Sequence, residues 1–138
     1  MTVLIRKLVV DDTDAVVSLW AEAFPHDPAR NEPRAMIARK IARDSDLFWV
    51  AEDGGVVIGA VIAGYDGVRG WLYHLAVVPA RRGEGVAKAL LNHAVAELRA
   101  LGCPKVNLQV RGNNAGVVAF YGGLGWVEDD TRAFGLSL

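Results

Sequence analysis

The spacing of apolar residues predicts a strand and two helices at the start of the chain. Val3 to Val10 is rich in β-branched and aliphatic residues, which is typical of a strand. The polar run Asp11 to Thr13 offers helix-capping side chains, and apolar residues then recur at helical spacing to about Phe24. Pro25 to Pro28 ends that helix, and Pro33 suits the first turn of the next one. Charges of both signs on the second helix indicate a solvated face.

Apolar runs and glycines in the middle of the chain predict three antiparallel strands. Leu47 to Ala51 and Val56 to Ala63 are separated by Gly54 and Gly55, and glycine readily adopts the positive φ angles of a tight hairpin turn. A third strand is predicted from about Gly70 to Val78.

The last third of the chain opens with its strongest helix signal. Val86 to Leu101 carries a continuous stripe of leucine and alanine, and Gly102 stands where a left-handed C-terminal cap is expected. A strand is predicted for Val106 to Val110, and Asn114 can cap a helix to about Leu124. Two short strands are predicted after that helix, up to the end of the chain.

The order of these elements predicts an α+β fold, in which about four helices flank a mixed, mostly antiparallel sheet. No linker and no internal repeat interrupts residues 1–138, so we expect a single domain. With 52% hydrophobic and 22% charged residues the chain is not of the disordered class, and its one cysteine excludes a disulfide scaffold.

Charge and hydropathy restrict the partners and the location that we expect. The 15 basic and 16 acidic residues give a net charge of −1, which provides no polybasic footprint for nucleic acid. The N-terminus lacks the apolar stretch of a signal peptide, and no apolar run reaches the roughly 20 residues of a membrane span. We therefore expect a cytoplasmic protein with no nucleic-acid or membrane partner. His26 and His93 are not at metal-ligand spacing, so no metal is expected; we expect His93 to face solvent and Cys103 to be a buried structural thiol.

Glycine is enriched, with 15 residues or about 11% of the chain against an average near 7%. The most informative cluster follows the strand that ends near Val78 and opens the long helix. Gly83 and Gly85 let the backbone curl, so that several N–H groups at the start of the helix can converge on one anion. Arg81 and Arg82 add positive charge. This turn predicts a phosphate or pyrophosphate site, although an ordinary strand-to-helix turn with exposed arginines is the alternative.

Two common nucleotide-binding motifs do not fit this turn. A P-loop requires Gly-Lys-Ser/Thr, whereas Gly85 is followed by Val86 and Ala87. A dinucleotide-binding fold requires a third glycine, and Lys88 stands at that position.

Three motifs in order resemble the GNAT superfamily of acetyl-CoA-dependent N-acetyltransferases. Arg82 to Ala87 fits the motif Arg/Gln-x-x-Gly-x-Gly/Ala, and Leu75 to Pro79 fits the Leu-Ala-Val-x-Pro run before it. Asn114 to Trp126 resembles the element Asn-x-x-Ala-x-x-x-Tyr-x-x-x-Gly-Phe, with departures at Val117 and Trp126. The strand Trp-Leu-Tyr-His-Leu-Ala-Val is similar to that of small bacterial members.

The resemblance implies direct transfer of an acetyl group from acetyl-CoA to a primary amine. It also implies that the preceding strand splays at a bulge near Ala76 and Val77, where the pantetheine arm can pair with the strand edge. The Val77 N–H would then donate to the thioester carbonyl. The residues that the resemblance assigns to the cofactor are Leu75, Ala76, Val77, Arg82, Gly83, Glu84, Gly85, Val86, Ala87, Asn114 and Tyr121.

Tyr121 is the implied general acid for the departing thiolate, and a packing tyrosine beside Phe120 is the alternative. The general base stays open among Glu52, His74 and Glu84, with water chains as a further alternative; His74 lies on the strand near the expected thioester and titrates in a useful range.

The acceptor amine is expected to enter over Trp20, Phe24, the segment Pro25 to Pro33 and the second helix, unless the two aromatic residues belong to the core. The acceptor could be a small molecule, a peptide or a protein amine. A non-catalytic acyl-CoA-binding regulatory module on the same fold is the alternative function, and homodimerisation is common in the family.

Overall fold

The structure, a computed structural model, describes residues 2–111 and 113–138. The chain divides into two compact units, one up to Leu108 and one from Gln109 onward, and each is described by itself. The strands of the first unit are β1 (Val3–Lys7), β2 (Phe48–Asp53), β3 (Val56–Tyr65), β4 (Gly70–Val77) and β5 (Val106–Leu108). Its helices are α1 (Thr13–Ala23), α2 (Pro33–Asp44) and α3 (Val86–Ala100), whereas α4 (Ala115–Gly123) belongs to the second unit.

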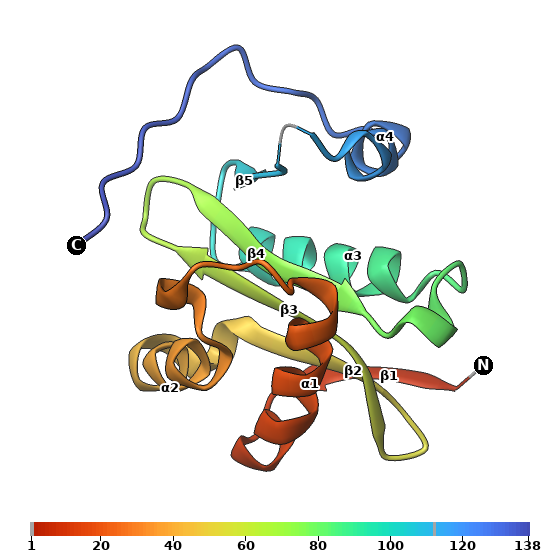
Figure 1. The fold of residues 1–138 in the computed structure, drawn as a ribbon. Helices are drawn as coiled ribbons and strands as arrows, with labels where there is room; N and C mark the ends of the chain where they lie inside the picture. The colour runs from red at the N-terminus through yellow and green to blue at the C-terminus, as the bar shows by residue number, and fades with distance from the viewer. Residues whose placement is uncertain (1, 112) are drawn as a thin grey trace. The chain divides into compact units, whose positions relative to one another are not determined.

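The five strands form one sheet in chain order, from β1 to β5 (Figure 1). Neighbouring strands from β1 to β4 run antiparallel, and β5 pairs with β4 in parallel. This arrangement confirms the predicted α+β fold with a mixed, mostly antiparallel sheet. The β2–β3 hairpin turns at Gly54 and Gly55, which have φ angles of 58° and 84° as the sequence predicted.

Helices cover both faces of the sheet (Figure 1). One face packs on α1 and α2 in a core whose buried members are Leu8, Val16, Leu19, Trp20, Ile37, Phe48, Val50, Ala60, Ile62 and Ala76. The other face packs on α3, whose buried side chains are Val86, Leu90, Leu91, Ala94 and Leu98. The alternation of side chains along each strand thus divides the apolar residues between two layers of helices.

Some of the strand predictions were wrong in extent, and two predicted strands do not form. β1 ends at Lys7 rather than Val10, because residues 10–12 coil into a 3-10 turn. β5 ends at Leu108 rather than Val110. The two strands predicted after α4 do not form in residues 124–138, which have neither helix nor strand. The alternation of Phe134, Leu136 and Leu138 supplies one apolar face, but a strand also needs a hydrogen-bonded neighbour, and the local pattern does not supply one.

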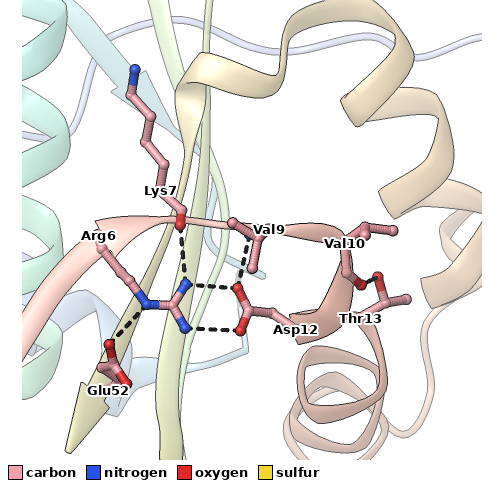
Figure 2. Close-up of polar contacts among 7 residues, drawn as sticks. All are labelled: Arg6, Lys7, Val9, Val10, Asp12, Thr13 and Glu52. Carbon is pink, nitrogen blue, oxygen red and sulfur yellow. Dashed lines mark hydrogen bonds and ion pairs between the residues drawn. The ribbon is translucent and has the colours of Figure 1, made fainter. Parts of the chain in front are cut away.

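The turn before α1 is held by an ion-pair network around Asp12 (Figure 2). The Arg6 guanidinium donates to both Asp12 carboxylate oxygens at 2.8 and 2.9 Å, and its Nε donates to Glu52 Oε1 at 2.9 Å. The Val9 N–H donates to the same Asp12 carboxylate at 2.8 Å. The Arg6 hydrogen bonds hold the pKa of Asp12 below its usual range, although burial acts in the opposite direction. Asp12, predicted as a helix cap, therefore ties β1 and β2 to the start of α1.

In the described part of the chain, no helix is long and apolar enough to cross a membrane.

Candidate active site

A β-bulge interrupts β4 in its second half. Tyr73 pairs with Ile62 and Ala76 pairs with Ala60, so His74 and Leu75 together oppose the single residue Val61. His74 has a φ of 53°, the only positive φ of a non-glycine residue among those described. The bulge was expected near Ala76 and Val77 and lies two residues earlier, where the backbone of His74 takes up the extra residue.

One edge of β4 is open beyond its pairing with β5. The parallel register runs only from Gly70 to Leu72, so in the described part of the chain no strand pairs with residues 73–77 on that side. The Val78 N–H donates to Ile58 O of β3 at 2.8 Å. Because backbone groups of successive strand residues point to opposite edges, the Val77 N–H and C=O point to the open edge. A substrate lying along this edge could pair with Val77 as an added strand would.

The glycine turn at the end of β4 has the geometry of an anion cradle. Gly83 and Gly85 have φ angles of 82° and 84°, which disfavour any residue with a side chain. A Cβ at either position would meet open space, so backbone conformation and not crowding demands glycine there. Gly85 is the N-cap of α3 and supplies no side-chain cap. The first N–H groups of α3 are therefore available to an anion, and the turn residues 82–85 are exposed.

The two arginines of the turn differ in their partners. Arg82 donates its Nε to Val77 O at 3.3 Å, which ties the turn to the end of β4. Arg81 instead forms ion pairs with Glu84 at 2.9 Å and Asp53 at 3.0 Å. The expectation that both arginines add charge for an anion therefore needs correction, because two carboxylates share the Arg81 guanidinium.

His74 forms a short hydrogen bond with a residue that sequence reasoning missed. Its Nε2 lies 2.7 Å from Asp27 Oδ2, and the two side chains are only 15% and 18% exposed. The His74 ring packs against Trp20 and Phe24 of the α1 region, with ring centroids 5.2 and 4.8 Å apart. The His74 carbonyl accepts the Trp20 indole N–H at 3.0 Å. If Nε2 donates to Asp27, Nδ1 is left as the nitrogen that can accept a proton.

Asp27 stands in the proline-bounded segment that was interpreted as a helix break and as part of the acceptor entry, with no role in proton transfer assigned to it. It is 47 residues from His74 in sequence, and no spacing rule links the two. Its N–H donates to Phe24 O at 3.3 Å, so the turn that follows α1 holds Asp27 over β4.

The two glutamates considered as bases are both held by arginines. Glu52 accepts Arg6 Nε at 2.9 Å and is therefore part of the network around Asp12. Glu84 accepts Arg81 Nε at 2.9 Å and lies in the anion turn. Of the three candidates, His74 alone is paired with a carboxylate, the arrangement that favours a proton acceptor.

The aromatic residues expected near the acceptor divide between core and site. Trp20 is 1% exposed and stacks on Phe48, so it belongs to the core, where its ring also packs against the His74 ring. Phe24 is half-buried against His74. A surface cavity of about 450 Å³ lies on the same helix-covered face, and Lys40 of α2 and Trp71 and Tyr73 of β4 are among its lining residues.

Two expectations outside the site need correction. His93 does not simply face solvent: its ring packs edge-on against buried Trp49, with ring centroids 5.4 Å apart. Cys103 is half-buried rather than buried, and its thiol donates to Lys105 O at 3.3 Å.

The second unit carries the two remaining candidates, Asn114 and Tyr121. Asn114 Oδ1 accepts the Val117 N–H at 3.2 Å, so it caps α4 as predicted. The Tyr121 ring packs edge-on against Phe120 and Trp126, with centroids 5.2 and 5.7 Å apart. Burial raises the pKa of Tyr121, so its hydroxyl keeps its proton at neutral pH.

The known proteins that this chain resembles in sequence are acetyltransferases. Residues 13–126 match the acetyltransferase (GNAT) family. The chain is 43% identical over 127 residues to an acetyltransferase of Sodalis glossinidius, covering 92% of this chain and 89% of that protein. It is 42% identical over 134 residues to an acetyltransferase of Pectobacterium atrosepticum, covering 97% and 94%.

Solved structures show the same fold at lower identity. Ard1 from Thermoplasma volcanium aligns with a TM-score of 0.82 at 23% identity, covering 92% of this chain and 84% of that one. The enzyme AAC(6')-Iy, in complex with a bisubstrate analogue of CoA and acetylneamine, aligns with a TM-score of 0.81 at 20% identity, covering 100% and 99%.

Proposed function

Because this chain belongs to the acetyltransferase (GNAT) family and transfers the acetyl group of acetyl-CoA to an amine, we propose that His74, oriented by Asp27, is the base that deprotonates that amine. The observation that carries this proposal is the 2.7 Å contact between His74 Nε2 and Asp27 Oδ2 at the bulge of β4. An amine that is protonated in water must lose a proton before it can attack, and a histidine titrates in the range where this is feasible.

Asp27 acts on His74 and not on the substrate. A carboxylate that accepts the Nε2 proton fixes the tautomer in which Nδ1 is the basic nitrogen. It also stabilises the positive charge that the ring acquires when it takes up the proton. The Trp20 indole N–H donates to the His74 carbonyl, so both the backbone and the ring of His74 are held from the α1 side.

The binding of acetyl-CoA is assigned to the open edge of β4 and to the turn that follows it. The cosubstrate supplies an activated thioester, whose carbonyl oxygen gains negative charge during attack. The Val77 N–H is the donor that we assign to that oxygen, because it points to the open edge. The backbone of the exposed residues 82–85 and the first N–H groups of α3, which begins with Val86 and Ala87, are assigned to the phosphates. Leu75 is assigned to the pantetheine arm together with Val77. Ala76 is only 7% exposed and pairs with Ala60 of β3, so the expectation that it contacts the cosubstrate is not carried over.

The departing thiolate needs a proton, and Tyr121 is the residue that we propose to supply it. Its hydroxyl stays protonated at neutral pH because burial raises its pKa. Asn114, besides capping α4, is proposed to contact the pantetheine arm, as the family resemblance implies. Both assignments require the two units to form one domain, which we also propose.

The acceptor is proposed to approach over the face that carries His74. The cavity lined by Lys40 and Tyr73 lies on that face, and Tyr73 precedes His74 in the chain. Lys40 and Arg43 are balanced there by Asp44 and Asp66, so the lining does not select an acceptor by net charge. A small molecule, a peptide and a protein amine therefore all stay open as the acceptor.

The test begins with binding and then measures turnover. Acetyl-CoA at about 100 times its Kd should raise the unfolding free energy by roughly 2.7 kcal/mol. Thiol release is then followed with a panel of amines, peptides and protein N-termini to identify an acceptor. With that acceptor, His74→Gln is expected to lower kcat about 100-fold or more and Asp27→Asn to lower it less, with the KM of acetyl-CoA unchanged in both variants.

The matched control is His93→Gln, because His93 is also a half-buried histidine with a ring contact and a carboxylate neighbour. Its kcat should stay close to that of the wild type. If His74→Gln turns over as fast as the control, His74 is not the base. If acetyl-CoA binds but no amine in the panel releases thiol, the alternative of a non-catalytic acyl-CoA-binding module is favoured.

The expectations of a cytoplasmic location, of no metal requirement, of no nucleic-acid partner and of homodimerisation stay predictions.

A further inference from the structure

Arg81 joins two segments of the chain that are distant in sequence. Its Nη2 lies 3.0 Å from Asp53 Oδ2, at the end of β2 beside the hairpin turn. Its Nε donates to Glu84 Oε1 at 2.9 Å, within the anion turn. The Arg81 side chain is 24% exposed, compared with 31% for Asp53 and 38% for Glu84, so all three are partly withdrawn from solvent.

Glu84 is an unexpected residue for a turn that binds an anion. It stands between the two glycines, Gly83 and Gly85, whose conformation exposes the backbone N–H groups. An anion held by those N–H groups lies within one Debye length of the Glu84 carboxylate, about 8 Å at physiological ionic strength. A negative charge at this distance opposes binding unless a cation compensates it.

The two arginines therefore have different tasks. No carboxylate lies within ion-pair distance of Arg82 among the residues that the structure describes, and Arg82 is exposed. The positive charge of Arg81 is shared by two carboxylates, and the hydrogen bond to Glu84 contributes most to raising the pKa of Arg81. The ion pair with Asp53, beside the β2–β3 hairpin turn, fixes the Arg81 guanidinium in the position in which it faces Glu84.

We propose that Arg81 is a positioning residue for acetyl-CoA: it does not bind the phosphates but neutralises Glu84 and holds that carboxylate away from them. The inference rests on the proposed function, since it requires the cosubstrate to bind at this turn. It predicts that the loss caused by removing Arg81 is recovered when the Glu84 charge is removed as well.

The experiment measures the Kd of coenzyme A by titration calorimetry for four variants, a control variant and the wild type at two salt concentrations. Arg81→Gln is expected to raise the Kd about tenfold at low salt and less at high salt, because ions screen the repulsion. Glu84→Gln removes the repelling carboxylate and keeps the backbone of the turn, so it should bind coenzyme A more tightly than the wild type. The double variant Arg81→Gln/Glu84→Gln should return to within about twofold of Glu84→Gln. Asp53→Asn should weaken binding less than Arg81→Gln does.

Arg99→Gln is the matched control, because Arg99 is an exposed arginine in the last turn of α3, at the end of the helix opposite the glycine turn, and it should leave the Kd unchanged. The inference is overturned if Arg81→Gln binds like the wild type, if the double variant binds as weakly as Arg81→Gln, or if Asp53→Asn is as weak as Arg81→Gln. If the wild type does not bind coenzyme A, the proposed cosubstrate site itself fails, and the two failures are thereby distinguished.

Discussion

Gly59 of β3 allows the sheet to approach α3 more closely than any side chain would. A Cβ at this position would lie 2.9 Å from Leu90 Cδ1, 3.0 Å from the backbone oxygen of Ala76 and 3.4 Å from Val86 Cγ1. The Ala76 oxygen belongs to the neighbouring strand and cannot rotate away, and Leu90 is fully buried. Gly59→Ala must therefore displace β4 or the first turns of α3, and overpacking of this kind costs about 1–3 kcal/mol.

Gly64 in the same strand provides the control for this substitution. A Cβ at Gly64 meets nothing within 4 Å, so Gly64→Ala removes the same conformational entropy from the unfolded chain without a clash. We expect Gly59→Ala to lower the free energy of unfolding by about 2 kcal/mol relative to Gly64→Ala, which corresponds to roughly 6–10 °C in Tm.

The same substitution should also reach the cosubstrate site. Val86 begins α3 directly after the glycine turn, and Gly59 pairs from β3 with Val77, whose N–H points to the open edge on the other side of β4. We expect the Kd of coenzyme A to rise several-fold in Gly59→Ala and to stay unchanged in Gly64→Ala. Urea unfolding and calorimetry measure the two effects, and equal stability of the two alanine variants would refute the packing argument.

Two further predictions concern the ion-pair network and the second unit. Asp12→Asn should lower the unfolding free energy by about 2 kcal/mol at pH 7, less than for a fully buried pair because Arg6 is 28% exposed and also contacts Glu52. The pKa of Asp12 is lower in the folded state than in the unfolded state, so the ionised carboxylate contributes fully to the free energy of unfolding above about pH 4, and this contribution is lost as the pH falls through the folded-state pKa. Urea unfolding should therefore show a smaller difference in unfolding free energy between Asp12→Asn and the wild type at pH 3 than at pH 7. Tyr121→Phe should lower kcat about tenfold or more and leave the Kd of acetyl-CoA within twofold, and undiminished turnover in a steady-state assay would remove its role as the acid.

Local patterns were sufficient for most of the fold. The helix from Val86 and the Gly54–Gly55 hairpin follow from apolar periodicity and from backbone conformations that glycine favours, which are properties of neighbouring residues. The end of β1 was misjudged because Asp12 bonds to Arg6 and the Val9 N–H, and this network competes with a longer strand. The predicted C-terminal strands depended on a partner that local alternation does not specify.

In the candidate site, too, features set by neighbouring residues could be predicted, whereas contacts between distant segments could not. The conformation of the glycine turn could be predicted because its glycines and the start of the helix are contiguous in sequence; its binding of an anion stays a prediction. The pairing of His74 with Asp27 could not be predicted, because 47 residues separate them and only the packing of α1 on the sheet brings them together. The ion pair of Arg81 with Asp53 was missed for the same reason, since Asp53 lies in the β2–β3 hairpin, far from Arg81 in sequence.

The bulge of β4 places the His74 side chain where the proposed base must lie. Tyr73 shares its face of the sheet with Ile62, its cross-strand partner, and regular alternation would point the next residue toward α3. The positive φ of His74 keeps its side chain on the face of α1 and α2, where it meets Asp27. For a residue with a Cβ this conformation costs about 1–2 kcal/mol, so surrounding contacts must stabilise it. The Trp20 indole bond to the His74 carbonyl and the Asp27 bond to its ring provide such contacts from α1 and the turn that follows it. The strain therefore lies on the residue whose position the proposed chemistry requires.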